Sequence, residues 1–284
     1  MSSTQRVIKY CATAFAVLLA VGIITSIAGL AFSVISVVSG GEISIGGWNG
    51  KTIDVSESFE DVKSLDIDNA TGTLNIKIGE TFKVDAENVS EKFEAKVNSS
   101  GKLTISEKSK HGFLWFDFDG ISSPNSKITV YLPADFVAKD VKIDTGAGNV
   151  TIEGLKSDTL LISAGAGNVK GSDMTAEEVK VDGGVGSVNL NHVNFNNVDF
   201  DCGVGSLNLD GYLSGKTEID CGVGSVNLDI TGKLDDYDLN IDSGVGTVRL
   251  NGKKVSGSYN KDNDALNSIE VDGGVGDVNI DFME

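Results

Sequence analysis

The sequence predicts an all-β protein: a parallel β-solenoid of about 19-residue coils, preceded by one N-terminal transmembrane helix. Three observations support this prediction. A glycine-rich phrase recurs at a fixed spacing in the second half of the chain. Apolar and polar residues alternate almost everywhere after residue 50, which is the period of a β-strand. A long stretch without any charge lies near the N-terminus.

The uncharged stretch covers residues 11–38. It is longer than the roughly 20 residues that span a bilayer, and longer than the apolar part of a signal peptide. Arg6 and Lys9 precede it, so the positive-inside rule places residues 1–10 in the cytoplasm and the rest of the chain outside. We therefore expect a single-pass protein of the cell membrane, with a cleaved signal peptide as the alternative. Residues 39–50 are rich in glycine and predict a linker.

Residues 51–140 predict irregular N-terminal β coils, interrupted by an aromatic insert at 107–126. A solenoid needs a cover over its first coil, and we expect the insert to form that cap. The alternative is an exposed hydrophobic patch that binds a partner through Phe113, Trp115 and Phe116.

Residues 141–284 carry the glycine-rich repeats. Seven copies of a phrase such as "VKVDGGVGSVNL" align on their glycines, and a weaker copy lies at 65–76. The first five copies are evenly spaced, and insertions precede the last two. Fixed periodicity of this kind indicates a repeat architecture. The first glycines of the copies are Gly146, Gly165, Gly184, Gly203, Gly222, Gly244 and Gly274.

Each copy has an inward and an outward face. The alternation turns Val179 and Val181 inward, and Val188 and Leu190 return to the same side after the glycine corner. A single copy cannot bury its apolar face, whereas copies stacked in chain order at about 4.8 Å form a continuous core. One inner column is Ile143, Ile162, Val181, Phe200, Ile219, Ile241 and Val271.

An outward column of aspartates precedes the corner. Adjacent carboxylates in such a stack repel each other by roughly 1 kcal/mol even in a water-like dielectric, so something must offset the repulsion. We expect Asx-type turns, in which each carboxylate accepts hydrogen bonds from the backbone amides of the corner. The alternative adds a bridging cation such as calcium, and no other cofactor is expected. The candidate cation ligands are Asp182, Asp201, Asp220 and Asp242.

A second outward column carries amides that can hydrogen-bond along the stack. Its members are Asn189, Asn208, Asn227 and Asn279.

Cys202 and Cys221 point inward in adjacent copies, in a column of small residues. We expect them to fill a tight corner as buried thiols. Their Cα atoms would lie about 4.8 Å apart, which is inside the disulfide range, so a disulfide is the alternative.

Several function classes fit the sequence poorly. A net charge of −18 repels nucleic acid, so no nucleic-acid partner is expected. The phrase "GVGS" lacks the third glycine and the following helix of a nucleotide-binding loop, and the calcium-binding nonapeptide repeat requires Asp where Val188 stands. The chain shows no nucleophile motif and no cluster of metal ligands, and it has only two histidines. The sequence therefore predicts a protein that is not an enzyme.

Three stretches together carry a family resemblance: "SFEDVKSLDIDNATGTLNI", "KITVYLPADF" and the "VKIDTGAGNVTI"-type coils that follow the apolar stretch. Over residues 50–284 the chain resembles the bacterial "putative adhesin" domain family. The resemblance implies a right-handed parallel β-solenoid and supplies no catalytic residues. We expect a membrane-anchored, extracellular, non-catalytic module that binds a protein or glycan of the cell envelope. The alternatives are an accessory of envelope-stress signalling that acts through a membrane partner, and a glycan-cleaving enzyme.

Overall fold

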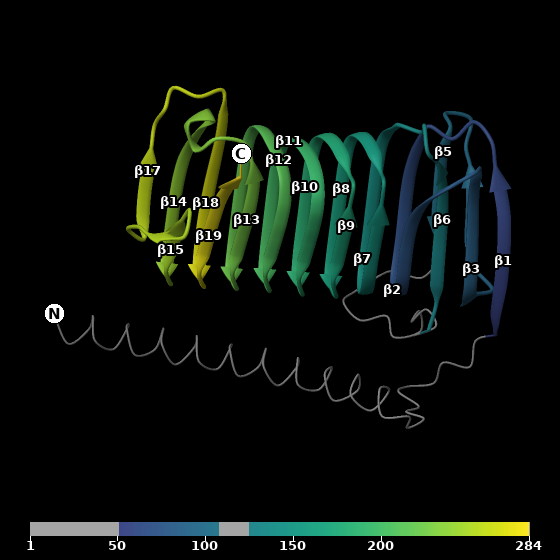
Figure 1. Cartoon of the computed structure of the whole chain (residues 1–284). Helices are drawn as coiled ribbons and strands as arrows, with labels where there is room; N and C mark the ends of the chain where they lie inside the picture. The colour runs from purple at the N-terminus through teal and green to yellow at the C-terminus, as the bar shows by residue number, and fades with distance from the viewer. Residues whose placement is uncertain (1–50, 108–124, 284) are drawn as a thin grey trace, which may run out of the picture. The chain divides into compact units, whose positions relative to one another are not determined.

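The computed structural model describes residues 51–107 and 125–283 (Figure 1). They belong to the second of the two compact units of the chain, which begins at Gly50. Within these ranges no helix is long and apolar enough to cross a membrane. The predicted transmembrane helix at 11–38 lies outside the described residues. So do Phe113, Trp115 and Phe116, and their proposed roles stay predictions.

The described elements are β-strands and one short 3-10 helix, η2 (Leu234–Asp236). In chain order the strands are β1 (Thr52–Phe59), β2 (Ser64–Gly79), β3 (Phe82–Ser90), β4 (Glu94–Val97), β5 (Lys102–Ser106), β6 (Lys127–Pro133), β7 (Ala138–Glu153), β8 (Lys156–Ala166), β9 (Val169–Ser172), β10 (Thr175–Val185), β11 (Val188–Val204), β12 (Leu207–Val223), β13 (Val226–Thr231), β14 (Tyr237–Val245), β15 (Val248–Leu250), β16 (Lys253–Lys254), β17 (Ser258–Lys261), β18 (Asn267–Val275) and β19 (Val278–Met283).

The repeats stack as parallel coils in register. Val179 of β10 pairs with Leu160 of β8 on one side and with Val198 of β11 on the other, and each is the equivalent residue of a neighbouring copy. The same register continues through β7, β9, β12 and β13. The prediction of an all-β solenoid in which each repeat forms one coil is confirmed.

Stacked apolar columns fill the interior of the solenoid. Phe200, Ile143 and Val271 are fully buried, and Ile162 is 2% exposed. The column on the returning strands, which includes Val188 and its equivalents in the other coils, is buried as well. β-Branched and aromatic side chains dominate these positions because they pack well on a pleated surface.

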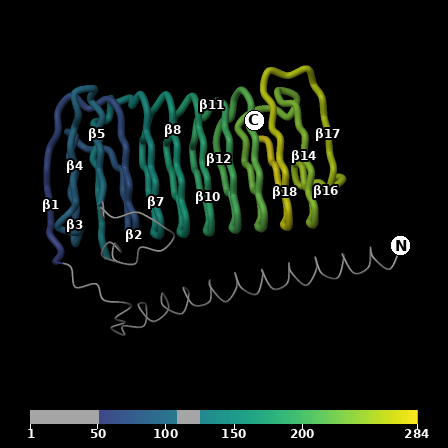
Figure 2. Tube along the Cα trace, turned by 180° about the vertical axis from the view of Figure 1, so that it is seen from behind, coloured from purple at the N-terminus to yellow at the C-terminus, as the bar shows by residue number. Residues whose placement is uncertain are grey.

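The C-terminal coils do not stack in chain order, which corrects the expected order of the columns. β18 pairs in parallel with both β12 and β14, and β19 pairs with both β13 and β15. The last coil in sequence therefore lies between the two coils that precede it, as both views show (Figures 1 and 2). Val271 follows Ile219 in the inner column, and Ile241 comes last.

The N-terminal end also departs from chain order. β2 pairs in parallel with β7 on one side and with β5 and β6 on the other. β4 pairs antiparallel with β5, β3 with β6, and β1 with β3. At the other end β17 and β16 pair antiparallel with β14 and β15. Each end of the parallel stack is thus closed by antiparallel strands, which occupy hydrogen-bonding edges that would otherwise be open.

The glycine corner permits the coils to approach closely. Gly205 has a φ of 150°, and a Cβ built on it would overlap the carbonyl oxygen of Gly186 in the neighbouring coil. Along the whole stack, the second glycine of each G-x-G phrase lies in the same way against the second glycine of the phrase in the neighbouring coil. The repeated glycines are therefore required by contact between backbones.

Candidate functional site

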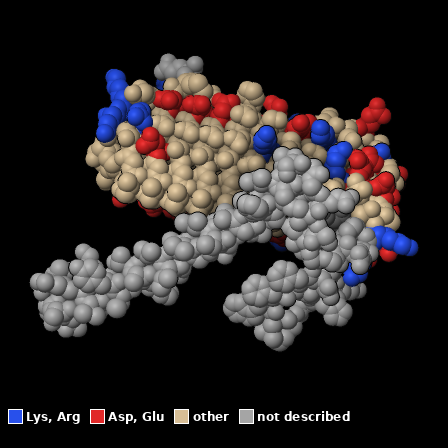
Figure 3. All heavy atoms as spheres, turned by 90° about the horizontal axis from the view of Figure 1, so that it is seen from below, with Lys and Arg blue, Asp and Glu red and all other residues tan. Residues whose placement is uncertain are grey.

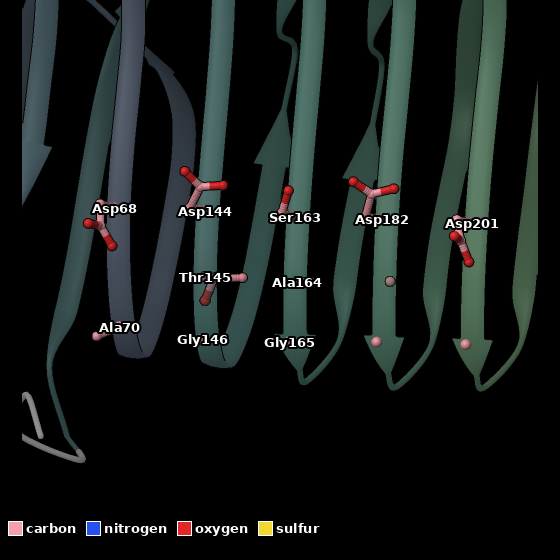
Figure 4. Close-up of a pocket in the computed structure, with 13 residues that line it drawn as sticks. Asp68, Ala70, Asp144, Thr145, Gly146, Ser163, Ala164, Gly165, Asp182 and Asp201 are labelled. Atoms are coloured by element: carbon pink, nitrogen blue, oxygen red, sulfur yellow. The ribbon is translucent and has the colours of Figure 1, made fainter. Parts of the chain in front are cut away.

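The corner side of the solenoid carries a row of carboxylates, one on most coils. Strand register places them in line, with Ser163 interrupting the sequence between the second and the third. Figure 4 shows the first part of this row above the glycine corner. In spatial order the aspartate row consists of Asp68, Asp144, Asp182, Asp201, Asp220, Asp272 and Asp242.

The expected Asx-type turns are absent from the aspartate row in the described part of the chain, so that prediction is wrong. The corner amides donate to the next coil instead: the N–H of Gly186 bonds to the carbonyl of Val204 at 2.9 Å, and that of Gly205 to Val223 at 2.8 Å. The parallel hydrogen-bond ladder continues through the corner and takes the donors that the carboxylates would need.

Lysines offset only part of the charge in the aspartate row. Lys180 Nζ lies 3.6 Å from Asp182 and 2.6 Å from Asp199, and Lys142 pairs with Asp144. No ion pair of the described residues reaches Asp220, which lies beside Asp201 and Asp272 in the stack. Partial burial and these two neighbouring carboxylates raise the pKa of Asp220 above its ordinary value.

A shallow groove runs below the aspartate row. One hollow of about 740 Å³ extends from Asp68 to Asp201 over the first corners, and a second of about 480 Å³ continues from Asp201 to Asp242. Glycines line much of both hollows, so backbone rather than side chains forms the floor. The groove is a surface for contact along several coils and not an enclosed ligand pocket.

An exposed row of valines lies directly beside the groove. Each valine is the middle residue of a G-x-G phrase, and the row is continuous because the strands are in register. This valine row consists of Val185, Val204, Val223, Val275 and Val245, which are 42%, 48%, 49%, 51% and 67% exposed. Figure 3 views this edge from below and shows a broad strip without charged atoms, with acidic side chains gathered along its borders.

The alternation of apolar and polar residues does not predict the valine row. A signal for it was present: a valine between two glycines, at a corner where φ is positive, cannot follow the strand alternation. Glycines on both sides also leave no neighbouring side chains to cover it. An apolar residue repeated at such a corner predicts an outward-facing stripe.

No metal centre is formed in the regions that the structure describes. No three His, Cys, Asp or Glu side chains there converge closely enough to hold a metal ion. The bridging cation on Asp182, Asp201, Asp220 and Asp242 stays a prediction.

The asparagine column behaves as predicted. Asn208 Nδ2 donates to Asn189 Oδ1 at 2.8 Å, and Asn227 Nδ2 donates to Asn208 Oδ1 at 2.7 Å. Asn279 Nδ2 continues the ladder to Asn227 Oδ1 at 2.8 Å, as the exchanged order of the coils requires. Arg249 ends it with a contact of 3.5 Å to Asn279 Oδ1.

Cys202 and Cys221 are adjacent, buried and unbonded. They are 6% and 5% exposed, and both lie along the second hollow of the groove. The expected burial is confirmed, and the disulfide stays a prediction.

The chain matches one protein family. A family model described as Toastrack DUF4097 matches residues 62–284. No curated protein matches the chain. The family resemblance that the sequence indicated is confirmed by this family model.

One solved structure is a "putative cell adhesion protein" from Clostridium sporogenes ATCC 15579, with 19% identity, coverage of 82% of this chain and 100% of that chain, and a TM-score of 0.34. Another is a "putative adhesin" from Bacteroides fragilis NCTC 9343, with 17% identity, coverage of 82% and 97%, and a TM-score of 0.43. A third is a "putative adhesin" from Parabacteroides merdae ATCC 43184, with 14% identity, coverage of 83% and 98%, and a TM-score of 0.30.

Proposed function

The chain belongs to the Toastrack DUF4097 family, and from that premise we propose that its solenoid is a non-catalytic, adhesin-like module that binds a protein partner along the glycine corner. The valine row is the observation that carries this proposal. Five valines in register make an exposed apolar stripe roughly 19 Å long at the usual spacing of strands. Isolated exposed apolar residues need no explanation, whereas an aligned row marks an interaction site.

The surroundings of the valine row define the chemistry of the partner. The aspartate row borders it, and Asp220 and its neighbours lack cationic partners among the described residues. An apolar stripe beside an acidic border complements a protein surface with an apolar ridge flanked by Lys or Arg. A stripe of valines favours a protein over a glycan, because sugar rings pack best on aromatic faces.

The sequence supports a proposal for the placement of the module. We propose that residues 11–38 anchor it in the cell membrane, with the N-terminus cytoplasmic and a right-handed solenoid outside the cell. Its partner is then a protein of the cell envelope. The acidic charge of −18 would attract a basic partner and keep the module away from anionic nucleic acid.

Site-specific photo-crosslinking in cells tests the proposal. A photoreactive amino acid replaces Val204 in the full chain, and the matched control replaces Tyr212, which is similarly exposed at 41%. We expect an adduct with a basic envelope protein from position 204 and not from position 212. The yield should fall when Asp201 and Asp220 are changed to Asn. Equal adducts from both positions, or none from position 204, would refute binding at the corner.

A further inference from the structure

We propose that Cys202 and Cys221 form a redox site, in which an intramolecular disulfide joins two neighbouring coils beneath the glycine corner. Three features of the two residues support this modification independently of any binding partner: their register, the space around them, and their place beside the groove.

Register brings the two residues into the range of a disulfide. Cys202 of β11 is the Cα partner of Cys221 of β12, and neighbouring strands lie about 4.8 Å apart. Disulfides join Cα atoms that are about 4.4–6.8 Å apart. Both side chains are buried in the same column of the interior. A disulfide therefore needs rotation of the two side chains and no change in the stacking of the coils.

The column supplies the space for that rotation. Gly183 pairs with Cys202 on one side, and Gly273 pairs with Cys221 on the other. A Cβ placed on Gly183 would meet no atom closer than 3.6 Å, an ordinary van der Waals contact, so there is room for a further carbon next to Cys202. On the Cys221 side the space is tighter, because a Cβ on Gly273 would lie 3.2 Å from Val278 Cγ2, so the room for side-chain movement is next to Cys202.

The groove provides a route for a small oxidant. The hollow of about 480 Å³ is lined by both cysteines and by the glycines of four corners, and it is open to solvent. The hydrogen bond from Cys221 lowers the pKa of Cys202, whereas the same bond raises the pKa of Cys221. Cys202 is therefore the thiol that attacks first, because the thiolate is the nucleophile.

The reaction is a thiol–disulfide exchange with a low-molecular-weight disulfide as the oxidant. The thiolate of Cys202 attacks one sulfur of the oxidant, its S–S bond breaks, and one small thiolate leaves. Cys221 then attacks the sulfur of Cys202 in the mixed disulfide, loses its proton to solvent, and releases the second small thiolate. One protein disulfide forms, two protein thiols are oxidised, and the oxidant is reduced to two thiols.

The product closes the loop from Cys202 to Cys221, which is one full coil of the solenoid. Such a bond limits the unfolded chain and ties together two coils that carry adjacent members of the valine and aspartate rows. We expect the melting temperature of the full chain to rise by about 5–10 °C on oxidation, which is the shift for a loop of this length in a domain of this size.

The test uses the full chain with the third cysteine removed (Cys11→Ser). The reduced protein is incubated with oxidised glutathione under native conditions, the remaining thiols are alkylated, and the digest is analysed by mass spectrometry. The expected result is a crosslinked peptide pair that contains Cys202 and Cys221 in monomeric protein, together with a higher melting temperature that a thiol reductant reverses.

The matched control is Cys202→Ala/Cys221→Ala, because Ala164 shows that alanine fits the same column. Its melting temperature should not respond to oxidised glutathione. The inference is overturned by a stable glutathione adduct on Cys202 without a crosslink, by crosslinks only between molecules, or by a crosslink that appears only after denaturation.

Discussion

Asp220 and Asn208 illustrate how the same stacking can either destabilise or stabilise the solenoid. Both point outward, and both have equivalents in the neighbouring coils. Stacked amides donate and accept in turn, so Asn208 makes two hydrogen bonds along the ladder. Stacked carboxylates can only accept, so they repel one another at the same spacing. The aspartate row is therefore a cost to the fold, and its presence agrees with a role in binding.

The destabilisation of the folded state by the aspartate row depends on pH. The pKa of Asp220 is raised above 3.8 in the folded protein by partial burial and by Asp272 and Asp201. Between pH 3.8 and that raised value the folded state binds more protons than the unfolded state, so the free energy of unfolding falls as the pH rises. At neutral pH this destabilisation of the folded state has its full value.

Changing Asp220→Asn should consequently stabilise the protein at neutral pH. The gain should be at most about 0.5 kcal/mol, because the side chain is only slightly buried and solvent screens most of the repulsion. Urea unfolding at pH 7 measures the change. The difference from the wild type should shrink as the pH is lowered towards 3.8.

The opposite control is Asp85→Asn. The hydrogen bond from Lys83 lowers the pKa of Asp85, so its stabilising contribution is present above pH 3.8 and is lost as the pH falls through its native value. The substitution should destabilise the protein at pH 7 by about 0.2–1 kcal/mol. Destabilisation by Asp220→Asn at pH 7 would contradict the account of the aspartate row.

At the scale of the strands, the exchange of coils at the C-terminal end is the main feature of the architecture. The coil of β14 and β15 takes the outer position because β16 and β17 fold back on it as antiparallel strands. The coil of β18 and β19 is left as the inner one. The C-terminus is thereby held on both sides, rather than by one neighbour as in a sequential stack.

Engineered disulfides test this order. In a background without native cysteines, Asp220→Cys/Asp272→Cys should oxidise readily, because Asp220 and Asp272 are paired in adjacent strands. The matched control Asp220→Cys/Asp242→Cys should not, because one coil intervenes and the Cα atoms lie about 9.6 Å apart, beyond the disulfide range. Crosslinking is read from non-reducing gels and peptide mass. A crosslink in Asp220→Cys/Asp242→Cys but not in Asp220→Cys/Asp272→Cys would show that the coils stack in chain order.

The sequence predicts which residues form the columns of the solenoid, but not the order in which the coils stack. The inner columns and the asparagine ladder follow from alternation and period alone, as Phe200 and Asn227 show. The order of the coils does not, because every copy presents nearly the same inner residues and any adjacent pair of copies satisfies the same register. The antiparallel closing strands lie in the insertions, where the repeat gives no signal.

The candidate site was partly predictable for a similar reason. Alternation and period predict the aspartate row as a column. They do not predict its hydrogen bonds, because the parallel ladder takes the amides of Gly186 and Gly205. The valine row could be found only by noticing that the alternation stops at the corner.

For the whole molecule, charge decides how solvent conditions change stability. The chain has 41 acidic and 23 basic residues. The described ion pairs are formed mostly by exposed side chains, and exposed pairs contribute little. Net repulsion within the acidic surface therefore opposes folding at neutral pH, and the aspartate row concentrates that repulsion along one edge.

The melting temperature should therefore rise with the concentration of sodium chloride at pH 7. The distance between neighbouring carboxylates in the aspartate row sets the salt concentrations over which it rises. At about 0.1 M salt the screening length is roughly 10 Å, so only repulsion beyond two coils is removed. At about 1 M it is roughly 3 Å, shorter than the spacing of about 4.8 Å, and repulsion between neighbours is screened as well. The rise should continue over this whole interval, and it should be smaller in Asp201→Asn/Asp220→Asn/Asp272→Asn.

Calcium chloride at matched ionic strength separates screening from specific binding. No three carboxylates converge in the described residues, so calcium should raise the melting temperature no more than sodium chloride does. An additional rise with calcium that disappears in the triple variant would instead establish a cation bridging the aspartate row. The distinction holds because screening depends on ionic strength alone, whereas a bridging ion stabilises the folded state according to its own concentration and affinity.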